Sequence, residues 1–280
     1  MSTPMQALTH KYFRHKKLFP HVWCPGCGNG IVMGALLRAV AGLGLEKDQV
    51  MLVSGIGCSG RMPAYLDFNT LHTTHGRALT FSTGIKLVKP ALNVVTIMGD
   101  GDATAIGGNH FIHAARRNLN LTAVIINNSI YGMTGGQYSP TTPLGSLTTT
   151  SVYGHVERPF SIAELAMTAG ASFVSRTTVY HAAMADQLIA QAVMKPGFAV
   201  VEIISNCHVQ YGRRNKLGNA ADMLTQFKEQ SVTVRQAESM SQEELQEKTI
   251  IGVLADRDLP VSTDEYEKVR EQAGKQQEAP

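Results

Sequence analysis

A carboxylate and an amide that follow two consecutive apolar segments form the most suggestive chemical pattern in the chain. Asp100 lies in the GDGD motif at 99–102, and Asn128 closes the pair Asn127-Asn128. Because each follows an apolar strand of one expected βαβ unit, both side chains can meet at the same sheet edge. Carboxylate, amide and backbone carbonyl oxygens suit Mg²⁺, and glycines let the backbone approach a phosphate. The pattern predicts a site for a diphosphate bridged to Mg²⁺; the alternative is a glycine turn beside an unrelated asparagine pair.

The four cysteines could form a second centre. Cys24 and Cys27 are separated by Pro and Gly in a tight turn, while Cys58 and Cys207 each follow an expected strand. The sulfurs of the first two can converge on one metal, and since parallel strands end on one edge, Cys58 and Cys207 can lie near each other and near the diphosphate. A structural zinc site and a [4Fe–4S] cluster would each use every cysteine, whereas a thioredoxin-like pair would leave Cys58 and Cys207 unexplained. Cysteine spacing alone leaves zinc and the cluster open.

Both groups of residues need a sheet that places them at one edge. Apolar runs alternate with amphipathic segments: the expected strands are 51–57, 94–102, 121–129, a short one around Phe173 and 199–205, and the expected helices are 111–118, 163–171 and 181–194. Continuous apolar strands separated by helices predict an α/β fold with a doubly wound, mostly parallel sheet. A dinucleotide site is not expected, because the glycines after residue 55 depart from the fingerprint and no acidic residue follows about 20 residues later.

Composition excludes several functional classes. The 280 residues are 44% hydrophobic and 17% charged, with a net charge of +3. A charged fraction below the usual value of about 25% indicates that a partner subunit covers part of the surface, and so small a net charge does not indicate nucleic acid binding. The apolar stretch 30–45 contains Arg38 and is too short for a membrane span, and the N-terminus has no apolar secretory core. We therefore expect a cytoplasmic protein without structural disulfides.

Three parts are expected along the chain. Residues 1–20 form a basic N-terminal arm, and residues 21–210 form the α/β domain that carries both candidate centres. Residues 211–280 are polar and rich in Gln, Glu and Lys, with an apolar patch at 249–256. We expect this last part to be an arm that packs on a partner subunit; the alternative is a loosely ordered extension.

Six segments, taken in order, match a known family. They are CPGCGNG from Cys24, GIGCSGR from Gly55, HGRA from His75, GDGD from Gly99, NNSIYGMTGGQ from Asn127 and SPTTP from Ser139. The GDG followed by an asparagine pair resembles the thiamine diphosphate signature. The whole set, spanning residues 20–260, resembles the β subunits of 2-oxoacid:ferredoxin oxidoreductases, most closely the 2-oxoglutarate branch. The resemblance implies a thiamine diphosphate-binding fold, and it favours one [4Fe–4S] cluster over zinc.

The resemblance also implies roles for individual residues. Mg²⁺ would be held by Asp100, Asn128 and the carbonyl of Ile130, and the cluster by Cys24, Cys27, Cys58 and Cys207. The residues that would contact thiamine diphosphate are Ile56, Gly57, Cys58, Ser59, His75, Gly76, Arg77, Ala78, Gly101, Asp102, Gly132 and Met133. His75 is the candidate catalytic side chain beside the cofactor. Arg61 could pair with a distal carboxylate and so favour 2-oxoglutarate over pyruvate; its alternative is a role at the cofactor or the subunit interface.

The implied activity is the reversible oxidative decarboxylation of a 2-oxoacid with coenzyme A, which yields an acyl-CoA and CO₂ and reduces ferredoxin. With 2-oxoglutarate the product is succinyl-CoA. In this superfamily the carboxylate that activates thiamine lies on a separate pyrimidine-binding domain, and no second α/β unit is evident in the sequence. An α subunit is therefore implied, in an αβ heterodimer that doubles to (αβ)₂. The alternatives are a pyruvate or broad 2-oxoacid enzyme, a non-redox thiamine enzyme with structural zinc, and a non-catalytic electron-transfer or scaffold subunit.

Two basic runs flank the cysteines. If the cysteines converge, these runs would form a positive patch that steers an acidic ferredoxin. The alternatives are two unrelated solvated runs or binding of coenzyme A phosphates. The residues are Lys11, Arg14, Lys16 and Lys17 before Cys24, and Arg213, Arg214 and Lys216 after Cys207.

Overall fold

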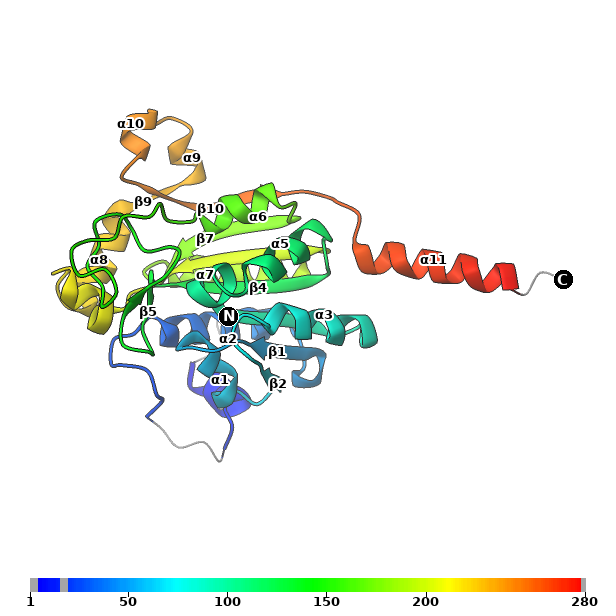
Figure 1. Cartoon of the computed structure of the whole chain (residues 1–280). Helices are drawn as coiled ribbons and strands as arrows, with labels where there is room; N and C mark the ends of the chain where they lie inside the picture. The colour runs from blue at the N-terminus through cyan, green and yellow to red at the C-terminus, as the bar shows by residue number, and fades with distance from the viewer. Residues whose placement is uncertain (1–4, 16–19, 278–280) are drawn as a thin grey trace.

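Two apolar strands, β4 (Leu121–Asn127) and β8 (Phe198–Ile204), form the centre of an eight-stranded sheet in the computed structural model, which describes residues 5–15 and 20–277 (Figure 1). The strand order is β2-β1-β3-β4-β8-β7-β10-β9. All pairings from β2 to β7 are parallel, whereas β10 runs antiparallel to β7. The predicted α/β fold with a mostly parallel sheet is confirmed. The other strands are β1 (Val50–Ser54), β2 (Asn69–His72), β3 (Asn93–Gly99), β7 (Phe173–Thr178), β9 (Ser231–Thr233) and β10 (Thr249–Asp256), and β5 (Ile130–Tyr131) pairs with β6 (Gln137–Tyr138) in a separate hairpin.

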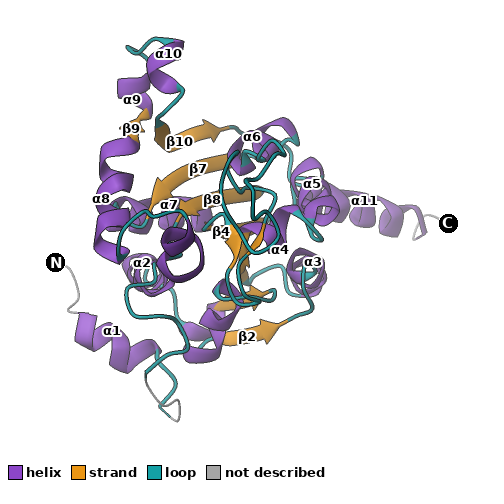
Figure 2. Ribbon diagram, turned by 60° about the vertical axis from the view of Figure 1, so that its left-hand side comes forward, coloured by secondary structure: helices purple, strands orange, loops and turns teal. Residues whose placement is uncertain are grey.

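Helices cover both faces of the sheet (Figure 2). The helices α2 (Asn29–Gly42) and α7 (Ala182–Met194) pack together on one face, and α3 (Ala78–Val88), α5 (Gly108–Arg116) and α6 (Ile162–Thr168) pack on the other. The apolar stretch 30–45, which was considered above only as a possible membrane span, forms most of α2. The remaining helices are α1 (Met5–Tyr12), α4 (Asp100–Thr104), α8 (Ala220–Gln230), α9 (Val234–Ala237), α10 (Gln242–Leu245) and α11 (Ser262–Gln277), with 3-10 helices η1 (Lys47–Gln49) and η2 (Ser59–Tyr65) and the π-helix η3 (His208–Gly212).

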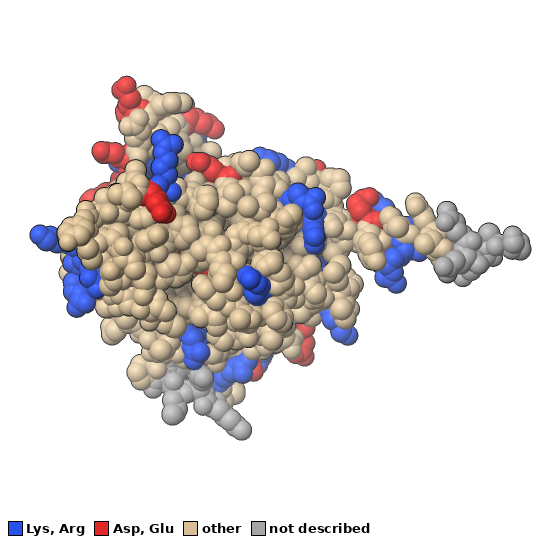
Figure 3. Space-filling model, in the orientation of Figure 1, with Lys and Arg blue, Asp and Glu red and all other residues tan. Residues whose placement is uncertain are grey.

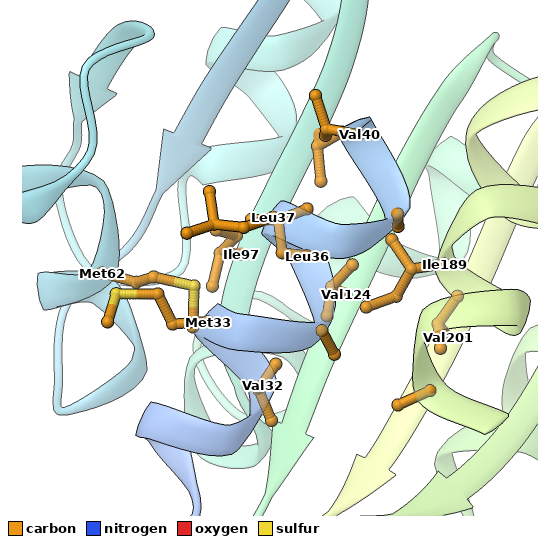
Figure 4. Packing of buried hydrophobic residues seen from close by; sticks show 14 of the residues in the cluster. Val32, Met33, Leu36, Leu37, Val40, Met62, Ile97, Val124, Ile189 and Val201 are labelled. Atoms are coloured by element: carbon orange, nitrogen blue, oxygen red, sulfur yellow. The ribbon is translucent and has the colours of Figure 1, made fainter. Parts of the chain in front are cut away.

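The alternation of side chains along β4 divides the core into two layers. Val124 and Ile126 belong to the cluster under α2 and α7, while Ala123 and Ile125 belong to the cluster under α3, α5 and α6. Successive side chains of a strand point to opposite faces, so a strand covered on both faces must be apolar throughout. Figure 4 shows the first cluster, with side chains of α2 and α7 packed over the strands. This core fixes the strand ends that carry the candidate site.

Part of the predicted C-terminal arm completes the sheet. The apolar patch 249–256 forms β10, which pairs with β7 through the register Gly252 with Arg176. Beyond it, α11 extends away from the body, at the end of the sheet opposite to α8 (Figure 1). In the predicted N-terminal arm, Tyr12 of α1 is buried and stacks on Phe68. The packing of residues 211–280 on a partner subunit stays a prediction.

Within residues 5–15 and 20–277, no helix has the length and apolar character needed to cross a membrane.

Substitutions along α7 test this description of the core. Ile189 is 0% exposed and packs under α2, whereas Met194 on the same helix is 60% exposed. We expect Ile189→Ala to lower the free energy of unfolding by about 2–5 kcal/mol, because a cavity replaces buried methyl groups. Met194→Ala, the matched control, should change it by at most about 0.5 kcal/mol. Urea unfolding of the full-length chain measures both, and equal losses would contradict the packing described for α7.

Candidate active site

A cleft at the carboxyl ends of β1, β3 and β4 collects residues of both predicted centres. Its empty volume is about 700 Å³, open mouth included. The strands that lead into it end at Ser54, Gly99 and Asn127, so turns that are far apart in sequence share one edge of the sheet. The predicted cofactor and metal residues that line the cleft are Ile56, Gly57, Cys58, Ser59, His75, Asp100, Gly101, Asp102, Asn128, Ile130, Gly132 and Met133.

Apart from three of the cysteines, four predicted residues lie outside the lining of this cleft. The backbone N–H of Gly76 donates to Oδ1 of Asp102 at 2.6 Å. The guanidinium of Arg77 donates to the carbonyls of Gly76 and Ile106 at 3.2 and 3.0 Å, and Ala78 is buried at the start of α3. Gly76 and Arg77 thus hold the loop of His75 against the region that follows α4. Arg61 lies in η2, and its pairing with a substrate carboxylate stays a prediction.

Asp100 is a buried carboxylate at the base of the cleft. It is 3% exposed; the hydroxyl of Ser139 donates to its Oδ2 at 2.5 Å, and Oγ1 of Thr141 lies 2.8 Å from the same oxygen. Burial raises the pKa of Asp100, and the two hydroxyls and the backbone N–H of Asn128 partly offset that rise. A buried carboxylate without a cation is costly. Its position therefore favours a bound positive ion.

The turn after β4 presents two further oxygen ligands. Ser129 adopts a left-handed φ of 59°, while its N–H donates to Oδ1 of Asn127 at 3.2 Å and its carbonyl accepts from Thr142 at 2.7 Å. Oδ1 of the neighbouring Asn128 is buried and, within the described part of the chain, has no hydrogen-bond partner. Leaving such an acceptor unpaired costs about 1–3 kcal/mol. The Asp100 carboxylate, this amide oxygen and the Ile130 carbonyl fit the ligands of Mg²⁺.

Gly101 lets the backbone and an aromatic ring come close together. A Cβ on Gly101 would collide with the ring of Tyr131, whose hydroxyl donates to the Gly101 carbonyl at 3.3 Å. Burial, reinforced by Asp100 and Asp102, raises the pKa of Tyr131 to about 12, so its phenol is neutral at ordinary pH. No role was predicted for Tyr131, Ser139 or Thr141, although each lies inside a motif already singled out. The hydroxyl groups within these motifs were the sequence feature that could have indicated hydrogen bonds to the carboxylates.

Asp102 faces His75. It is 2% exposed, and its Oδ1 lies 2.6 Å from Nδ1 of His75. Burial raises the pKa of Asp102, while the Gly76 N–H and His75 lower it. A Cβ on Gly55 would collide with this carboxylate, so glycine is required there. The arrangement favours Asp102 as the group that orients His75. Direct contact of Asp102 with a diphosphate stays a prediction, and an ionised carboxylate would oppose it.

All four cysteines line a smaller cavity beside the cleft. Cys58, Asn29, Asn128 and Gly132 line both spaces, so the two are contiguous. A Cβ on Gly132 would lie 3.3 Å from Sγ of Cys207 and 3.9 Å from Sγ of Cys58. Gly132 therefore lies at the wall between the predicted diphosphate site and the thiols.

Burial affects the acidity of three of the four thiols. Burial, followed by the effects of Cys27 and Cys207, raises the pKa of Cys58 to about 12. Burial also raises the pKa of Cys27 and of Cys207, so these thiols would ionise only on binding metal. Cys24 is exposed, and all four are free. Among the described residues, no group of three His, Cys, Asp or Glu side chains is already arranged to hold a metal ion, and the choice between zinc and a cluster stays a prediction.

Comparison with known proteins agrees with this geometry. Residues 55–203, which contain the turn after β1 and the cleft-forming strands β3 and β4, match the family model described as thiamine pyrophosphate enzyme, C-terminal TPP binding domain. The chain is similar to the 2-oxoglutarate synthase subunit KorB of Archaeoglobus fulgidus, with 53% identity over 95% of this chain and 96% of that protein. It is also similar to KorB of Methanocaldococcus jannaschii, with 47% identity over 93% and 96% of the two chains. The chain belongs to the KorB family of oxidoreductase β subunits.

A solved structure supports the family membership. It is described as 2-oxoglutarate:ferredoxin oxidoreductase from Magnetococcus marinus with 2-oxoglutarate, coenzyme A and succinyl-CoA bound. The two folds agree with a TM-score of 0.84 and 33% sequence identity, over 95% of this chain and 90% of the other. The predicted family is confirmed, and thiamine diphosphate is the cofactor of the domain that the cleft belongs to.

A methyl group at Gly101 tests the cleft as the cofactor site. Because the added Cβ of Gly101→Ala would displace the Tyr131 ring, we expect the affinity for thiamine diphosphate with Mg²⁺ to fall at least tenfold, or about 1.4 kcal/mol. Gly108→Ala is the matched control, since a Cβ there meets no atom within 4 Å. Titration calorimetry on the full-length chain with its partner subunit measures both. Unchanged affinity in Gly101→Ala would place the cofactor elsewhere.

Proposed function

We propose that the protein is the β subunit of an enzyme that oxidatively decarboxylates 2-oxoglutarate with coenzyme A, forms succinyl-CoA and CO₂, and reduces ferredoxin. The observation that carries this proposal is the shared wall between the two spaces: Cys58, Asn128 and Gly132 line both the thiamine cleft and the four-cysteine cavity. Electrons released in the cleft would thus enter a neighbouring acceptor directly. The Magnetococcus marinus structure, which is described with 2-oxoglutarate, coenzyme A and succinyl-CoA bound, supports the choice of substrate.

Different residues of the cleft would bind the metal and diphosphate and would control proton transfer. Thiamine diphosphate supplies the carbon nucleophile for the keto group and the electron sink for decarboxylation. Asp100, Asn128 and the Ile130 carbonyl would hold Mg²⁺, and Gly101 would let the diphosphate approach the backbone. Asp102 engages Nδ1 of His75, which leaves Nε2 as the nitrogen that can hold or deliver a proton in the cleft. Direct participation of His75 is part of this proposal.

We assign the cysteine cavity to one [4Fe–4S] cluster. Four thiolates are the ligands of such a cluster, and all four cysteines line this cavity. The similar solved structure is described as a ferredoxin oxidoreductase, and an electron-transferring enzyme supports a redox-active cluster over zinc. Because free thiols and a cluster suit a reducing compartment, we propose the cytoplasm as the location.

The surroundings of the cleft support an α subunit as partner. Apolar side chains near the mouth and on the loop after β6 are solvent-exposed, among them Met133 at 47%, Tyr153 at 99% and Val156 at 86%, and the face shown in Figure 3 carries few charges over this region. In the described chain the acidic side chains that line the cleft are Asp100 and Asp102, and both already have other roles. The carboxylate that activates thiamine would therefore come from the α subunit, in an αβ unit that doubles to (αβ)₂.

Metal and cofactor content tests the proposed function. After anaerobic copurification with the α subunit, we expect iron and sulfide in the amounts of one [4Fe–4S] cluster per chain, together with thiamine diphosphate. The complex should reduce ferredoxin with 2-oxoglutarate and coenzyme A, and pyruvate should be the poorer substrate. Zinc without iron would indicate a non-redox thiamine enzyme or a scaffold, and equal rates with pyruvate would indicate a broad 2-oxoacid enzyme.

Electrons would leave through the exposed side of the cysteine cavity. Cys24 is exposed, and its turn packs against η3 and α8, since a Cβ on Gly26 would lie 2.7 Å from Cβ of Ala220 and 3.7 Å from Cε1 of His208. Arg213, Arg214 and Lys216, all exposed, lie between these two elements, and Figure 3 shows basic side chains at the edge where α8 lies. In the other predicted run, Arg14 donates to Thr70 at 2.6 Å, and Lys16 and Lys17 lie outside the described residues.

Charge reversal tests this ferredoxin contact. We expect Arg213→Glu with Arg214→Glu to raise the KM for ferredoxin about tenfold at low salt, and the effect to shrink at high salt because exposed charges are screened. Lys268→Glu with Arg270→Glu on α11 is the matched control, because it reverses two charges at the opposite end of the sheet. Rates with a small dye acceptor should be unchanged in both. An unchanged KM for ferredoxin, or an equal rise in the control, would contradict the contact.

A further inference from the structure

A single carboxylate interrupts the apolar strand β8. Glu202 is 2% exposed and has no place in the lining of the cleft. Its Oε2 accepts from Nε of Arg176 on β7 at 2.8 Å, and its Oε1 accepts from Nδ2 of Asn127 at the end of β4 at 2.8 Å. The guanidinium of Arg176 also donates to Ser161 at 3.1 Å, where α6 begins. Glu202 thus links the surface of the sheet to the turn that follows β4.

The chemistry of these groups allows one orientation of the Asn127 amide. A guanidinium only donates hydrogen bonds and an ionised carboxylate only accepts them. With Arg176 holding Glu202, the amide nitrogen of Asn127 must face Glu202, and its oxygen must face the opposite way. There Oδ1 accepts from the N–H of Ser129 at 3.2 Å and lies 3.0 Å from Oγ1 of Thr141. If the amide turned over, a donor would face the Ser129 N–H.

Asn127 thereby connects both halves of the proposed Mg²⁺ ligand set. On one side, Thr141 lies 2.8 Å from Oδ2 of Asp100. On the other side, Oδ1 of Asn127 accepts a hydrogen bond from the N–H of Ser129, the residue between Asn128 and Ile130. This bond holds Ser129 at its left-handed φ of 59°. The orientation of one amide therefore determines how the carboxylate and the two other oxygens are placed relative to each other.

Stability alone does not account for a buried ion pair at this position. Removing two charges from water is costly, and apolar residues of similar volume often replace such a pair without loss of stability. The neighbours of Glu202 in β8 are apolar, so an apolar pair would fit the surrounding core.

We propose that Glu202 and Arg176 are positioning residues for the metal and diphosphate site: they fix the Asn127 amide and, through it, the turn that presents Asn128 and Ile130 to Mg²⁺. This inference rests on the proposed function, because it concerns the same Mg²⁺ and thiamine diphosphate site. Neither residue lines the cleft.

Metal affinity measures this role without reference to turnover. The full-length chain, copurified with its partner subunit and stripped of metal, is titrated with Mn²⁺ in the presence of thiamine diphosphate, and free Mn²⁺ is followed by electron paramagnetic resonance. We expect Glu202→Gln to weaken Mn²⁺ binding 10- to 100-fold, the usual effect of losing a group that orients metal ligands. A glutamine has one acceptor oxygen where the carboxylate has two, so it cannot accept from Arg176 and from Asn127 together and no longer enforces one orientation of the Asn127 amide.

Two further variants separate positioning from folding. The double variant Arg176→Met with Glu202→Leu replaces the pair by apolar groups; it should keep the thermal midpoint of the metal-free protein within a few degrees and still lose affinity for Mn²⁺. Asp186→Asn is the matched control, since Asp186 pairs with Arg38 through bonds of 2.7 and 2.9 Å between α2 and α7, on the face away from this turn. It should bind Mn²⁺ as the unaltered protein does.

The outcomes distinguish this inference from the proposed function. If the unaltered complex binds Mn²⁺ with thiamine diphosphate and the double variant binds it equally well, the pair is structural and the inference is wrong. If the double variant unfolds, the Glu202→Gln titration decides: unchanged affinity overturns the inference, and a 10- to 100-fold loss supports it. If the unaltered complex binds no thiamine diphosphate, the proposed function itself fails.

Discussion

Parallel strands place their carboxyl ends on one edge of a sheet, and both candidate centres of this protein depend on that constraint. The turns after β1, β3, β4 and β8 supply Cys58, Asp100, Asn128 and Cys207, residues that are far apart in the chain. The helices α2 and α7 hold the strands in register from one face, and α3, α5 and α6 hold them from the other. A cofactor site and an electron acceptor can share a wall here because neighbouring strands are close together in the sheet.

The apolar runs of β1, β3, β4 and β8 could be predicted from the sequence, because strands buried on both faces tolerate few polar residues. The site motifs could be predicted for a related reason, since glycines, Asp100 and Asn128 directly follow those runs. The place of β10 in the sheet was missed, because antiparallel pairing with β7 depends on tertiary contacts that no local pattern encodes. The carbonyl partners of Arg77 could not be predicted either, because long basic side chains select their partners in space.

The least predictable part of the site is its buried polar support. Ser139 and Thr141 reach Asp100 from a loop some forty residues away in the chain. Glu202 reaches Asn127 from the neighbouring strand. Each contact offsets the free energy of burying a polar group. These side chains are therefore favourable in the core only when all of their hydrogen-bond partners are present. Glu202 in the apolar strand β8 and Arg176, the one charged residue of β7, were visible in the sequence, and opposite charges in adjacent buried strands identify a candidate pair.

The same polar set is saturated on one side of the cleft, while three oxygens of lining residues have no partners. Hydroxyls, amides and backbone N–H groups saturate one side of Asp100 and Asn127, whereas Oδ1 of Asn29, Oδ1 of Asn128 and Oδ2 of Asp102 are buried and unpaired within the described residues. A network that satisfied every acceptor would stabilise the fold more and would leave nothing for a cation or a ligand proton to bind. The unpaired acceptors of the cleft therefore lie at the edge where the strands end. Donors that approach from outside the cleft hold the neighbouring polar groups in place.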